Sequence, residues 1–293
     1  MEHAATPGPT PAPTPHRVTE VTRDGLTLDV IDEGPLEGEP VVLLHGFPER
    51  ATSWRLVAPL LHAQGLRTLA VDQRGHSPRA RPRGRRAYAV QEFARDALAV
   101  VDAAGGRAHL VGHDWGAATG WVAAMLEPSR VASLTALSVP QPEAFMRSWF
   151  TSRQGLKSWY MAAFNVPRLP ERLARDEGGF MERLLGGGFG MTPDEVARFR
   201  REIVEDGALP GGLGWYRGIP FMDRSLLGRR VTVPTTLVWS DGDAAICRAP
   251  VDATPRYVDA PYELVVLQGV THWIPTQAPE AAAEAILERV LGS

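Results

Sequence analysis

The stretch Val111-Gly112-His113-Asp114-Trp115-Gly116 joins a short apolar run at residues 109–111 to a segment of helical periodicity at residues 117–126. Its two glycines stand two positions before and two after Asp114, and small residues there permit a tight turn between a strand and a helix. Such a turn presents its middle side chain above the end of a sheet. An aspartate that caps a helix in an ordinary turn is the alternative if the pentapeptide is taken alone.

Short apolar runs alternate with longer helical segments on both sides of this turn. The apolar runs are residues 41–44, 68–71, 109–111, 132–139, 235–239 and 263–267, and the helical segments are 54–62, 90–103, 117–126 and 280–291. Two further strand-like runs, 17–22 and 26–32, flank a turn at Arg23-Asp24-Gly25, which favours a hairpin. Strands that are apolar on both faces and alternate with helices indicate a mostly parallel, doubly wound α/β sheet.

The alternation stops between Pro140 and Arg230, where helix-like segments are interrupted by pairs and triplets of glycine. Within this stretch, Thr192-Pro193-Asp194-Glu195 has the composition of a capping box that begins a helix. We therefore expect a core made of residues 17–140 and 231–293, with a helical cap domain at 141–230. Residues 1–16 are rich in proline and predict a disordered leader.

Composition excludes several classes of function. Lys and Arg number 31 against 34 Asp and Glu, a net charge of −3, which is too balanced for a nucleic-acid or bilayer partner. The chain has one cysteine, Cys247, and neither a signal peptide nor a long apolar run is evident, so we expect a cytoplasmic protein. No spacing of histidine and cysteine predicts a metal site, and no cofactor is implied.

Three further positions carry polar groups at predicted strand ends. His45-Gly46-Phe47-Pro48 follows the run 41–44, Asp243 follows the run 235–239, and His272 follows the run 263–267. In this architecture the backbone N–H groups of Phe47 and Trp115 would form an oxyanion hole. A nucleophile, an acid and a histidine in this chain order, each after a strand, predict a catalytic triad.

With these motifs in place, the sequence resembles the α/β-hydrolase superfamily and, within it, the epoxide hydrolases. The resemblance covers residues 17–291 and includes two further motifs, Asp72-Gln73-Arg74-Gly75-His76-Ser77 and Gly269-Val270-Thr271-His272-Trp273. It implies an α/β-hydrolase fold with an inserted cap, Asp114 as nucleophile, His272 as base and Asp243 as the acid that orients it. Asp241 is a nearby rival for the last role, which the family spacing favours less.

An aspartate nucleophile decides the chemistry. A carboxylate is ionised at neutral pH and suits displacement at a saturated carbon, so we expect an alkyl ester on Asp114 that water activated by His272 hydrolyses. The expected reaction adds water to an epoxide and gives a vicinal diol. A haloalkane-type dehalogenase with the same triad is one alternative, and a catalytically silent binding protein with this fold is another.

The leaving group distinguishes the first two functions, because an alkoxide needs a proton donor and a halide does not. Tyr160 and Tyr216 each follow a tryptophan in the predicted cap, and the resemblance implies that both protonate the epoxide oxygen. Half-buried structural tyrosines are the simpler interpretation. The expected partner is a small-molecule epoxide bound against Phe47, Pro48 and Trp115, by a monomer or a homodimer.

The remaining conspicuous residues have simpler interpretations. His45, His76, His109 and His113 are expected to be structural, and the arginine-rich run 79–86 is expected to be a solvated loop. Five large apolar residues of the predicted cap indicate either a pocket wall or packing of the cap on the core: Met146, Trp149, Trp159, Met161 and Trp215.

Overall fold

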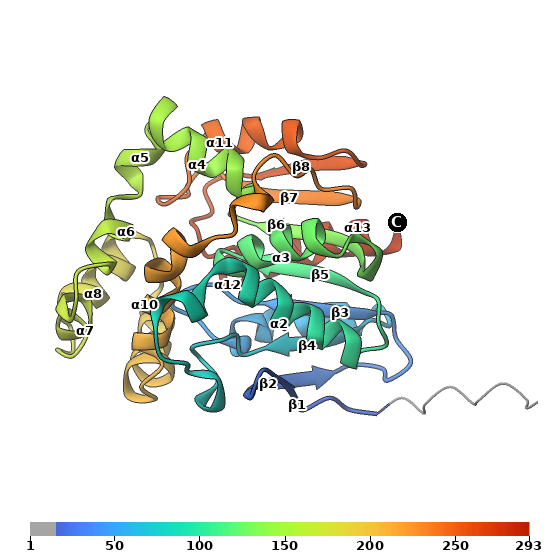
Figure 1. Ribbon diagram of the computed structural model, residues 1–293, viewed down its shortest axis with the longest axis horizontal. Coiled ribbons are helices and arrows are strands. Elements are labelled where there is room, and N and C mark those ends of the chain that lie inside the picture. Colours follow the sequence, from blue (N-terminus) through green and yellow to red (C-terminus); the bar gives the residue numbers. More distant parts are fainter. Residues whose placement is uncertain (1–15, 293) are drawn as a thin grey trace, which may run out of the picture.

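The computed structural model describes residues 16–292, which form an eight-stranded sheet flanked by helices (Figure 1). The strand order is β1-β2-β4-β3-β5-β6-β7-β8, and all pairs from β4 to β8 are parallel, while β2 is antiparallel to β1 and to β4. The strands are β1 Glu20–Arg23, β2 Leu26–Glu33, β3 Pro40–Leu44, β4 Arg67–Val71, β5 Ala108–His113, β6 Val131–Leu137, β7 Thr235–Ser240 and β8 Tyr262–Leu267. The predicted α/β-hydrolase fold is confirmed.

The hairpin that opens the sheet turns at Asp24 and Gly25, both with positive φ, as the Asp-Gly pair predicts. The first strand, however, begins at Glu20 rather than at residue 17. The backbone N–H of Val18 donates to the Asp32 carboxylate at 2.7 Å, so a side chain takes the place of a strand partner there.

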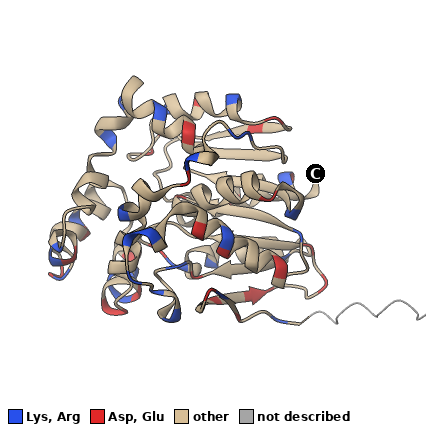
Figure 2. Cartoon of the chain, in the orientation of Figure 1, with Lys and Arg blue, Asp and Glu red and all other residues tan. Residues whose placement is uncertain are grey.

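Both faces of the sheet are buried. Val41 and Leu43 contribute to one apolar cluster, while Val42 and Leu44 contribute to the other, as alternation along a strand requires. Four of the inner strands, β3, β5, β6 and β7, carry no Lys, Arg, Asp or Glu (Figure 2). Fully buried parallel strands have this composition because neither face meets water.

Helices outside the segment between β6 and β7 cover the two faces. The α-helices are α1 Ala58–His62, α2 Val90–Ala103, α3 Trp115–Leu126, α11 Arg248–Ala253, α12 Ile274–Gln277 and α13 Pro279–Leu291. Short helices are η1 Ala51–Leu56, η2 Pro78–Ala80, η3 Arg85–Tyr88, η4 Pro128–Arg130 and η9 Thr254–Tyr257. The single helix predicted at 54–62 is instead η1 followed by α1, because Pro59 lacks the N–H that would continue an α-helix through this point.

Between β6 and β7 the chain leaves the sheet and forms helices that lie together at one edge of the molecule (Figure 1). We call residues 141–230 the insertion. Its elements are α4 Pro142–Thr151, α5 Gln154–Lys157, α6 Trp159–Phe164, α7 Leu169–Leu173, α8 Phe180–Arg183, η5 Leu184–Gly188, α9 Pro193–Phe199, η6 Arg200–Glu205, α10 Leu209–Gly218, η7 Ile219–Phe221 and η8 Arg224–Leu226. The predicted capping box at Thr192 and Glu195 is present at the start of α9. The division into core and cap domains stays a prediction.

The arginine-rich run 79–86 is largely exposed, as its composition predicts, but it also contacts the insertion. Arg81 is in an ion pair with Asp206, and Arg85 donates to the Arg217 carbonyl oxygen at 3.1 Å and to the Asn165 side chain at 2.8 Å. All three partners belong to the insertion. Residues 79–86 therefore help to attach the insertion to the rest of the chain, because Arg81 and Arg85 bind to groups of the insertion.

The structure bears on two further expectations, the proline-rich leader and the lack of a membrane-spanning segment. The proline-rich leader predicted at residues 1–16 lies outside the described residues, except for His16, whose carbonyl oxygen accepts a hydrogen bond from Arg67 at 2.7 Å. Within residues 16–292, none of the helices has the length and apolar character needed to cross a membrane.

The turn between β5 and α3 depends on close backbone packing. Asp114 has φ 52°, and a Cβ placed on Gly116 would lie 2.0 Å from the carbonyl oxygen of Leu44 in β3. A Cβ on Gly112 would lie 2.2 Å from the Gly116 carbonyl oxygen. Because backbone atoms cannot yield as a flexible side chain can, both positions require glycine.

We expect Gly116→Ala to destabilise the fold by at least about 2 kcal/mol, because the added methyl group must displace the backbone of β3. Gly187→Ala is the matched control, since a Cβ there meets nothing within 4 Å. Urea unfolding at neutral pH measures both variants. Equal midpoints for the two would contradict the packing described here.

Candidate active site

Asp114 lies at the carboxyl edge of β5, with its carboxylate turned toward two other segments. The backbone N–H of Phe47 donates to Asp114 Oδ1 at 2.8 Å, and His272 Nε2 lies 3.5 Å from Asp114 Oδ2. A Cβ on Gly46 would lie 2.8 Å from Oδ1, so glycine leaves the room in which Phe47 reaches the carboxylate. The two oxygens of Asp114 thus have different partners.

His272 is held from behind by Asp243. Its Nδ1 lies 2.7 Å from Asp243 Oδ2, and the other oxygen of Asp243 accepts backbone N–H bonds from Ala245 at 2.7 Å and Ile246 at 2.9 Å. Asp241 is exposed, and its carboxylate accepts the backbone N–H of Gly269 instead. The geometry therefore brings Asp243, not Asp241, to His272.

The main chain of His272 is fixed as well. Its carbonyl oxygen accepts a hydrogen bond from Ser138 Oγ at 2.8 Å and lies 2.9 Å from His113 Nε2. The other ring nitrogen of His113 lies 3.1 Å from Glu49 Oε2. His113 is thus a buried structural residue in this geometry, as we expected, and Glu49 is a contact that the sequence analysis did not single out.

The charges of the three residues are coupled. Burial lowers the pKa of His272, but the charge of Asp243 and hydrogen bonds to Asp114 and Asp243 outweigh it and raise the pKa to about 10. Burial raises the pKa of Asp114, but hydrogen bonding to His272 and its charge hold that pKa below the ordinary value. At neutral pH the site therefore favours an ionised Asp114 beside a protonated His272.

A narrow cavity of about 30 Å³ lies over Asp114 and His272. Tyr160 from α6 and Tyr216 from α10 line it, and their ring centroids lie 6.1 Å apart. Burial raises the pKa of both tyrosines, and the negative charge of Asp114 raises it further, so both hydroxyls keep their protons at neutral pH. The remaining lining residues are Phe47, Pro48, Phe164, Leu185, Phe189, Ala245 and Trp273.

None of the five large apolar residues that the sequence pointed to in the predicted cap lines this cavity. Trp215 is buried, donates its indole N–H to the Arg74 carbonyl oxygen at 2.7 Å and packs 5.9 Å from Trp115. Trp115 packs edge-on against Tyr216 at 5.2 Å, and neither tryptophan is among the cavity-lining residues of the described chain. Phe189 does line the cavity, but its glycine-rich neighbourhood carries no sequence signal for it.

Helix α5 joins the insertion to the loop that carries Asp243. Lys157 donates from Nζ to the Asp243 carbonyl oxygen at 2.7 Å, and Gln154 donates to the Ala245 carbonyl oxygen at 2.8 Å. Gln154 also accepts the backbone N–H of Cys247 at 2.9 Å. The position of Asp243 therefore depends on the insertion as well as on β7.

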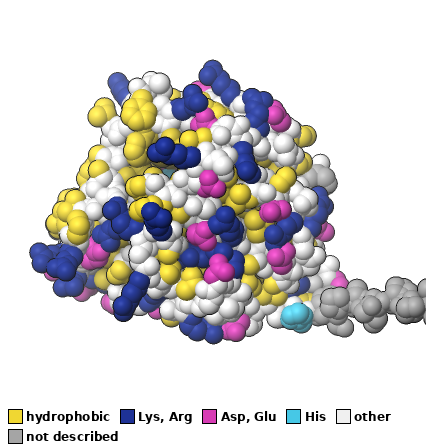
Figure 3. Space-filling model, in the orientation of Figure 1, with side chains coloured by type: hydrophobic (Ala, Val, Ile, Leu, Met, Phe, Trp, Pro, Cys, Tyr) yellow, Lys and Arg dark blue, Asp and Glu magenta, His cyan; other side chains and the backbone are white. Residues whose placement is uncertain are grey.

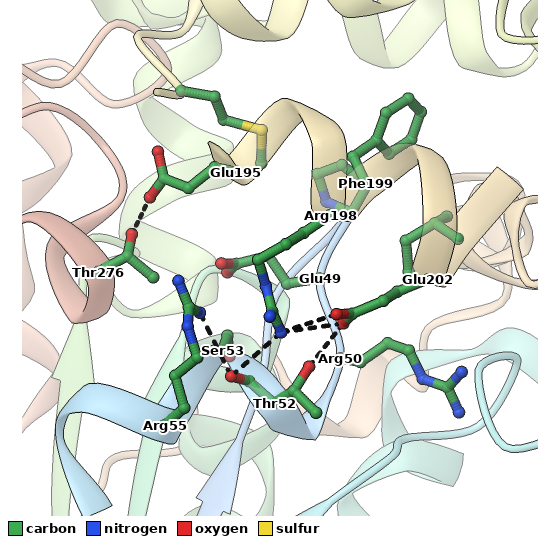
Figure 4. Close-up of a pocket in the computed structure, with 13 residues that line it drawn as sticks. Glu49, Arg50, Thr52, Ser53, Arg55, Glu195, Arg198, Phe199, Glu202 and Thr276 are labelled. Carbon is green, nitrogen blue, oxygen red and sulfur yellow. Dashed lines mark hydrogen bonds and ion pairs between the residues drawn. The ribbon is translucent and has the colours of Figure 1, made fainter. Parts of the chain in front are cut away.

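A second set of contacts joins α9 and η6 of the insertion to η1 and α12 of the rest of the chain, and it includes many polar side chains (Figure 4). Thr52 Oγ1 donates to Glu202 at 2.6 Å, and Arg198 lies 2.9 Å from the same carboxylate. Thr276, which follows His272 by four residues, donates to Glu195 of α9. These contacts close the insertion over the carboxyl edge of the sheet.

The fold and this site define a hydrolase of the α/β class. The sequence pattern described as the alpha/beta hydrolase fold matches residues 39–274, which is most of the chain. Among residues 16–292 no group of three His, Cys, Asp or Glu side chains is placed to hold a metal ion. That the protein needs no cofactor stays a prediction.

Comparison with known proteins narrows the class. The chain is 31% identical over 314 aligned positions to epoxide hydrolase A of Mycobacterium tuberculosis, covering 93% of this chain and 96% of that protein. It is 30% identical over 275 positions to the AB hydrolase superfamily protein YfhM of Bacillus subtilis, covering 92% and 96%. The chain belongs to the α/β-hydrolase superfamily and, within it, to the epoxide hydrolase family.

A solved structure gives the same result. The crystal structure of epoxide hydrolase A from Mycobacterium thermoresistibile superposes with a TM-score of 0.80 at 27% sequence identity. The superposition covers 93% of this chain and 97% of that one. The insertion is therefore part of the shared architecture.

His76, one of the four histidines expected to be structural, lies in an environment that opposes its protonation. It is fully buried, and neither ring nitrogen has a hydrogen-bond partner within residues 16–292. Burial holds its pKa well below 6.5. In the unfolded chain His76 binds a proton near pH 6.5, whereas in the folded protein it stays neutral at that pH. The contribution of His76 to the free energy of unfolding is therefore fully present above pH 6.5 and is lost as the pH falls below it.

We expect the free energy of unfolding of the wild type to fall between pH 7 and pH 5 more steeply than that of His76→Leu, by about 1.4 kcal/mol per pH unit below pH 6.5. Urea unfolding across this range measures the slope. His16→Leu, which removes an exposed histidine, is the control. An equal pH dependence of the free energy of unfolding in wild type and His76→Leu would show that folding does not lower the pKa of His76.

Proposed function

We propose that the protein is an epoxide hydrolase that adds water to an apolar oxirane through an alkyl ester on Asp114. The observation that carries this proposal is the shared cavity of Asp114, His272, Tyr160 and Tyr216, in which an ionised carboxylate faces two protonated phenols. The relatives named as epoxide hydrolases support the same substrate class.

In the first step, Asp114 Oδ2 attacks a ring carbon and the carbon–oxygen bond of the oxirane breaks. Oδ1 is the oxygen that Phe47 holds at 2.8 Å, so it becomes the ester carbonyl oxygen while Oδ2 forms the new bond. The oxygen released from the ring develops negative charge. It takes a proton from Tyr160 or Tyr216, whose hydroxyls are otherwise kept protonated by burial and by the Asp114 charge.

In the second step, His272 takes a proton from water, which attacks the ester carbonyl carbon. The bond between that carbon and Oδ2 then breaks, Oδ2 leaves as a hydroxyl oxygen of the diol with the proton that His272 took, and the oxygen from water stays in the Asp114 carboxylate. A histidine with a pKa of about 10 is a poor base near neutral pH, because it already holds its proton. Ester formation removes the negative charge of Asp114, which is one cause of the raised pKa of His272. On this proposal His272 then gives its proton to the tyrosinate left by the first step, which restores the phenol and leaves His272 free to act as a base. The Phe47 N–H, and on this proposal the Trp115 N–H, stabilise the oxyanion.

A dehalogenase with the same triad remains the second candidate, because Asp114 and His272 would serve it equally. It has no need of proton donors, whereas this cavity presents two tyrosines to the nucleophile. A silent binding protein is less well supported, since such a protein would not need to keep a buried ion pair of His272 and Asp243 at 2.7 Å.

We expect the wild type to convert styrene oxide and a long-chain terminal epoxide to diols, and Asp114→Ala to lose this activity entirely. Initial rates of diol formation measure it, with release of bromide from a primary bromoalkane followed in parallel. Bromide release without diol would identify a dehalogenase. Turnover of none of the three would contradict the proposed function for these substrates.

The tyrosines provide a control for the same assay. Tyr160→Phe combined with Tyr216→Phe keeps both rings but removes both hydroxyls, so epoxide opening should fall by about a hundredfold to ten-thousandfold. Retention of most activity by this variant would reject both residues as proton donors.

His272→Gln should separate the two steps. The first attack remains possible in this variant, but hydrolysis of the ester should slow by about a hundredfold or more, so the protein should gain the mass of one substrate molecule. Intact-protein mass spectrometry after rapid mixing with styrene oxide measures the adduct, and Asp114→Ala combined with His272→Gln is the control. An unmodified His272→Gln protein that still makes no diol would contradict covalent catalysis.

A further inference from the structure

Exposed apolar side chains are concentrated on one part of the insertion. Of the eleven large hydrophobic side chains that are exposed within residues 16–292, six lie between residues 150 and 180. They are Phe150 at 90% exposure, Leu156 at 78%, Trp159 at 51%, Phe180 at 46%, Val166 at 44% and Leu169 at 42%. We call these six residues the outer patch.

The outer patch follows neighbouring helices rather than being scattered. Trp159, Leu169 and Phe180 come from α6, α7 and α8 and line one apolar groove. Figure 3 shows hydrophobic side chains over α5, α6 and α8 at the edge of the molecule, with Lys and Arg side chains beside them. Soluble monomers seldom expose apolar side chains in such a group without a partner to cover them.

The charge around the outer patch is positive, although that of the whole chain is slightly negative. Residues 150–180 contain five basic side chains and three acidic ones, and one of the acidic ones, Glu171, is in an ion pair with Arg217. Four of the five basic side chains, Arg153, Arg168, Arg172 and Arg175, are exposed and take part in no ion pair within residues 16–292. Asp176 and Glu177 lie at the far end of the patch.

We propose that the outer patch and its arginines form a docking face for an anionic lipid surface. Aromatic and aliphatic side chains beside basic ones are the composition of a segment that lies in a membrane interface. Each basic side chain near such a surface adds to its attraction for anionic lipid. The prediction of no bilayer partner came from the net charge of the whole chain, which does not report how that charge is distributed.

A second copy of this chain fits the face less well. A symmetric dimer through the outer patch would bring the same four arginines of each copy together, and like charges in contact oppose association. An anionic lipid surface instead complements the arginines and accepts the apolar side chains.

The face also lies next to the catalytic cavity. Tyr160 and Phe164 line both that cavity and the groove of the outer patch, so these two side chains separate them. An apolar epoxide dissolved in lipid would thus meet the protein beside its active site. This part of the inference rests on the proposed function, whereas binding to lipid does not.

Sedimentation with vesicles tests the binding. The full chain should sediment with vesicles of equal parts phosphatidylcholine and phosphatidylglycerol and much less with phosphatidylcholine alone. Arg168→Gln with Arg172→Gln, and separately Leu156→Ser with Phe180→Ser, should each lower the partition coefficient about tenfold or more. Arg107→Gln with Arg256→Gln removes two exposed charges elsewhere and should leave it nearly unchanged.

Three other outcomes contradict the proposal. Failure of the wild type to sediment with anionic vesicles at low salt rejects it, as does an equal loss in the Arg107 and Arg256 control. Self-association of the wild type that Leu156→Ser with Phe180→Ser abolishes would make the face a dimer interface instead. Because the assay needs no turnover, vesicle binding without diol formation would reject only the proposed function, and diol formation without binding only this inference.

Discussion

Two carboxylates and one imidazole share a buried space at the carboxyl edge of the sheet, and none of the three would be stable there alone. Removing an isolated charge from water costs several kcal/mol, which the protein offsets here by placing His272 between Asp114 and Asp243 and by turning backbone N–H groups toward both carboxylates. The rest of the structure supplies the positions that this arrangement requires. Three strands end at the same edge, and the loop after β3 brings Phe47 within reach of Asp114.

The same arrangement explains why the core and the insertion depend on each other. Asp243 is held by its own loop and also by α5, through Lys157 and Gln154. The arginine-rich run fastens the other end of the insertion through Asp206 and Arg217. In the proposed two-step reaction, water must be kept from the first step and admitted for the second, and an insertion attached on several sides would help to control this.

Much of the core could be predicted from the sequence, because its strands and helices are regular and each polar motif directly follows a strand. The helix at 90–103 and the strand that ends before Asp243 are examples in which local periodicity decides the element. Less of the insertion could be predicted from the sequence. Phe189 and Leu185 reach the cavity from a glycine-rich segment without periodicity, and the partners of Arg81 and Arg85 in the insertion are 80 to 132 residues away in the chain. Such contacts depend on tertiary packing, which no local pattern records.

Lys157 is the one lysine in the sequence, and its ammonium group is engaged with the backbone of the Asp243 loop. Reagents that attach a protein to a resin or a sensor surface through lysine have, in this chain, a single side chain to react with. Acylation there would replace a charged donor with a bulky amide at the junction of α5 and the Asp243 loop. For this protein, tethering through a terminal tag would preserve the junction, whereas coupling through Lys157, or through Cys247, whose backbone N–H donates to Gln154, would alter the molecule at the place where its two parts meet.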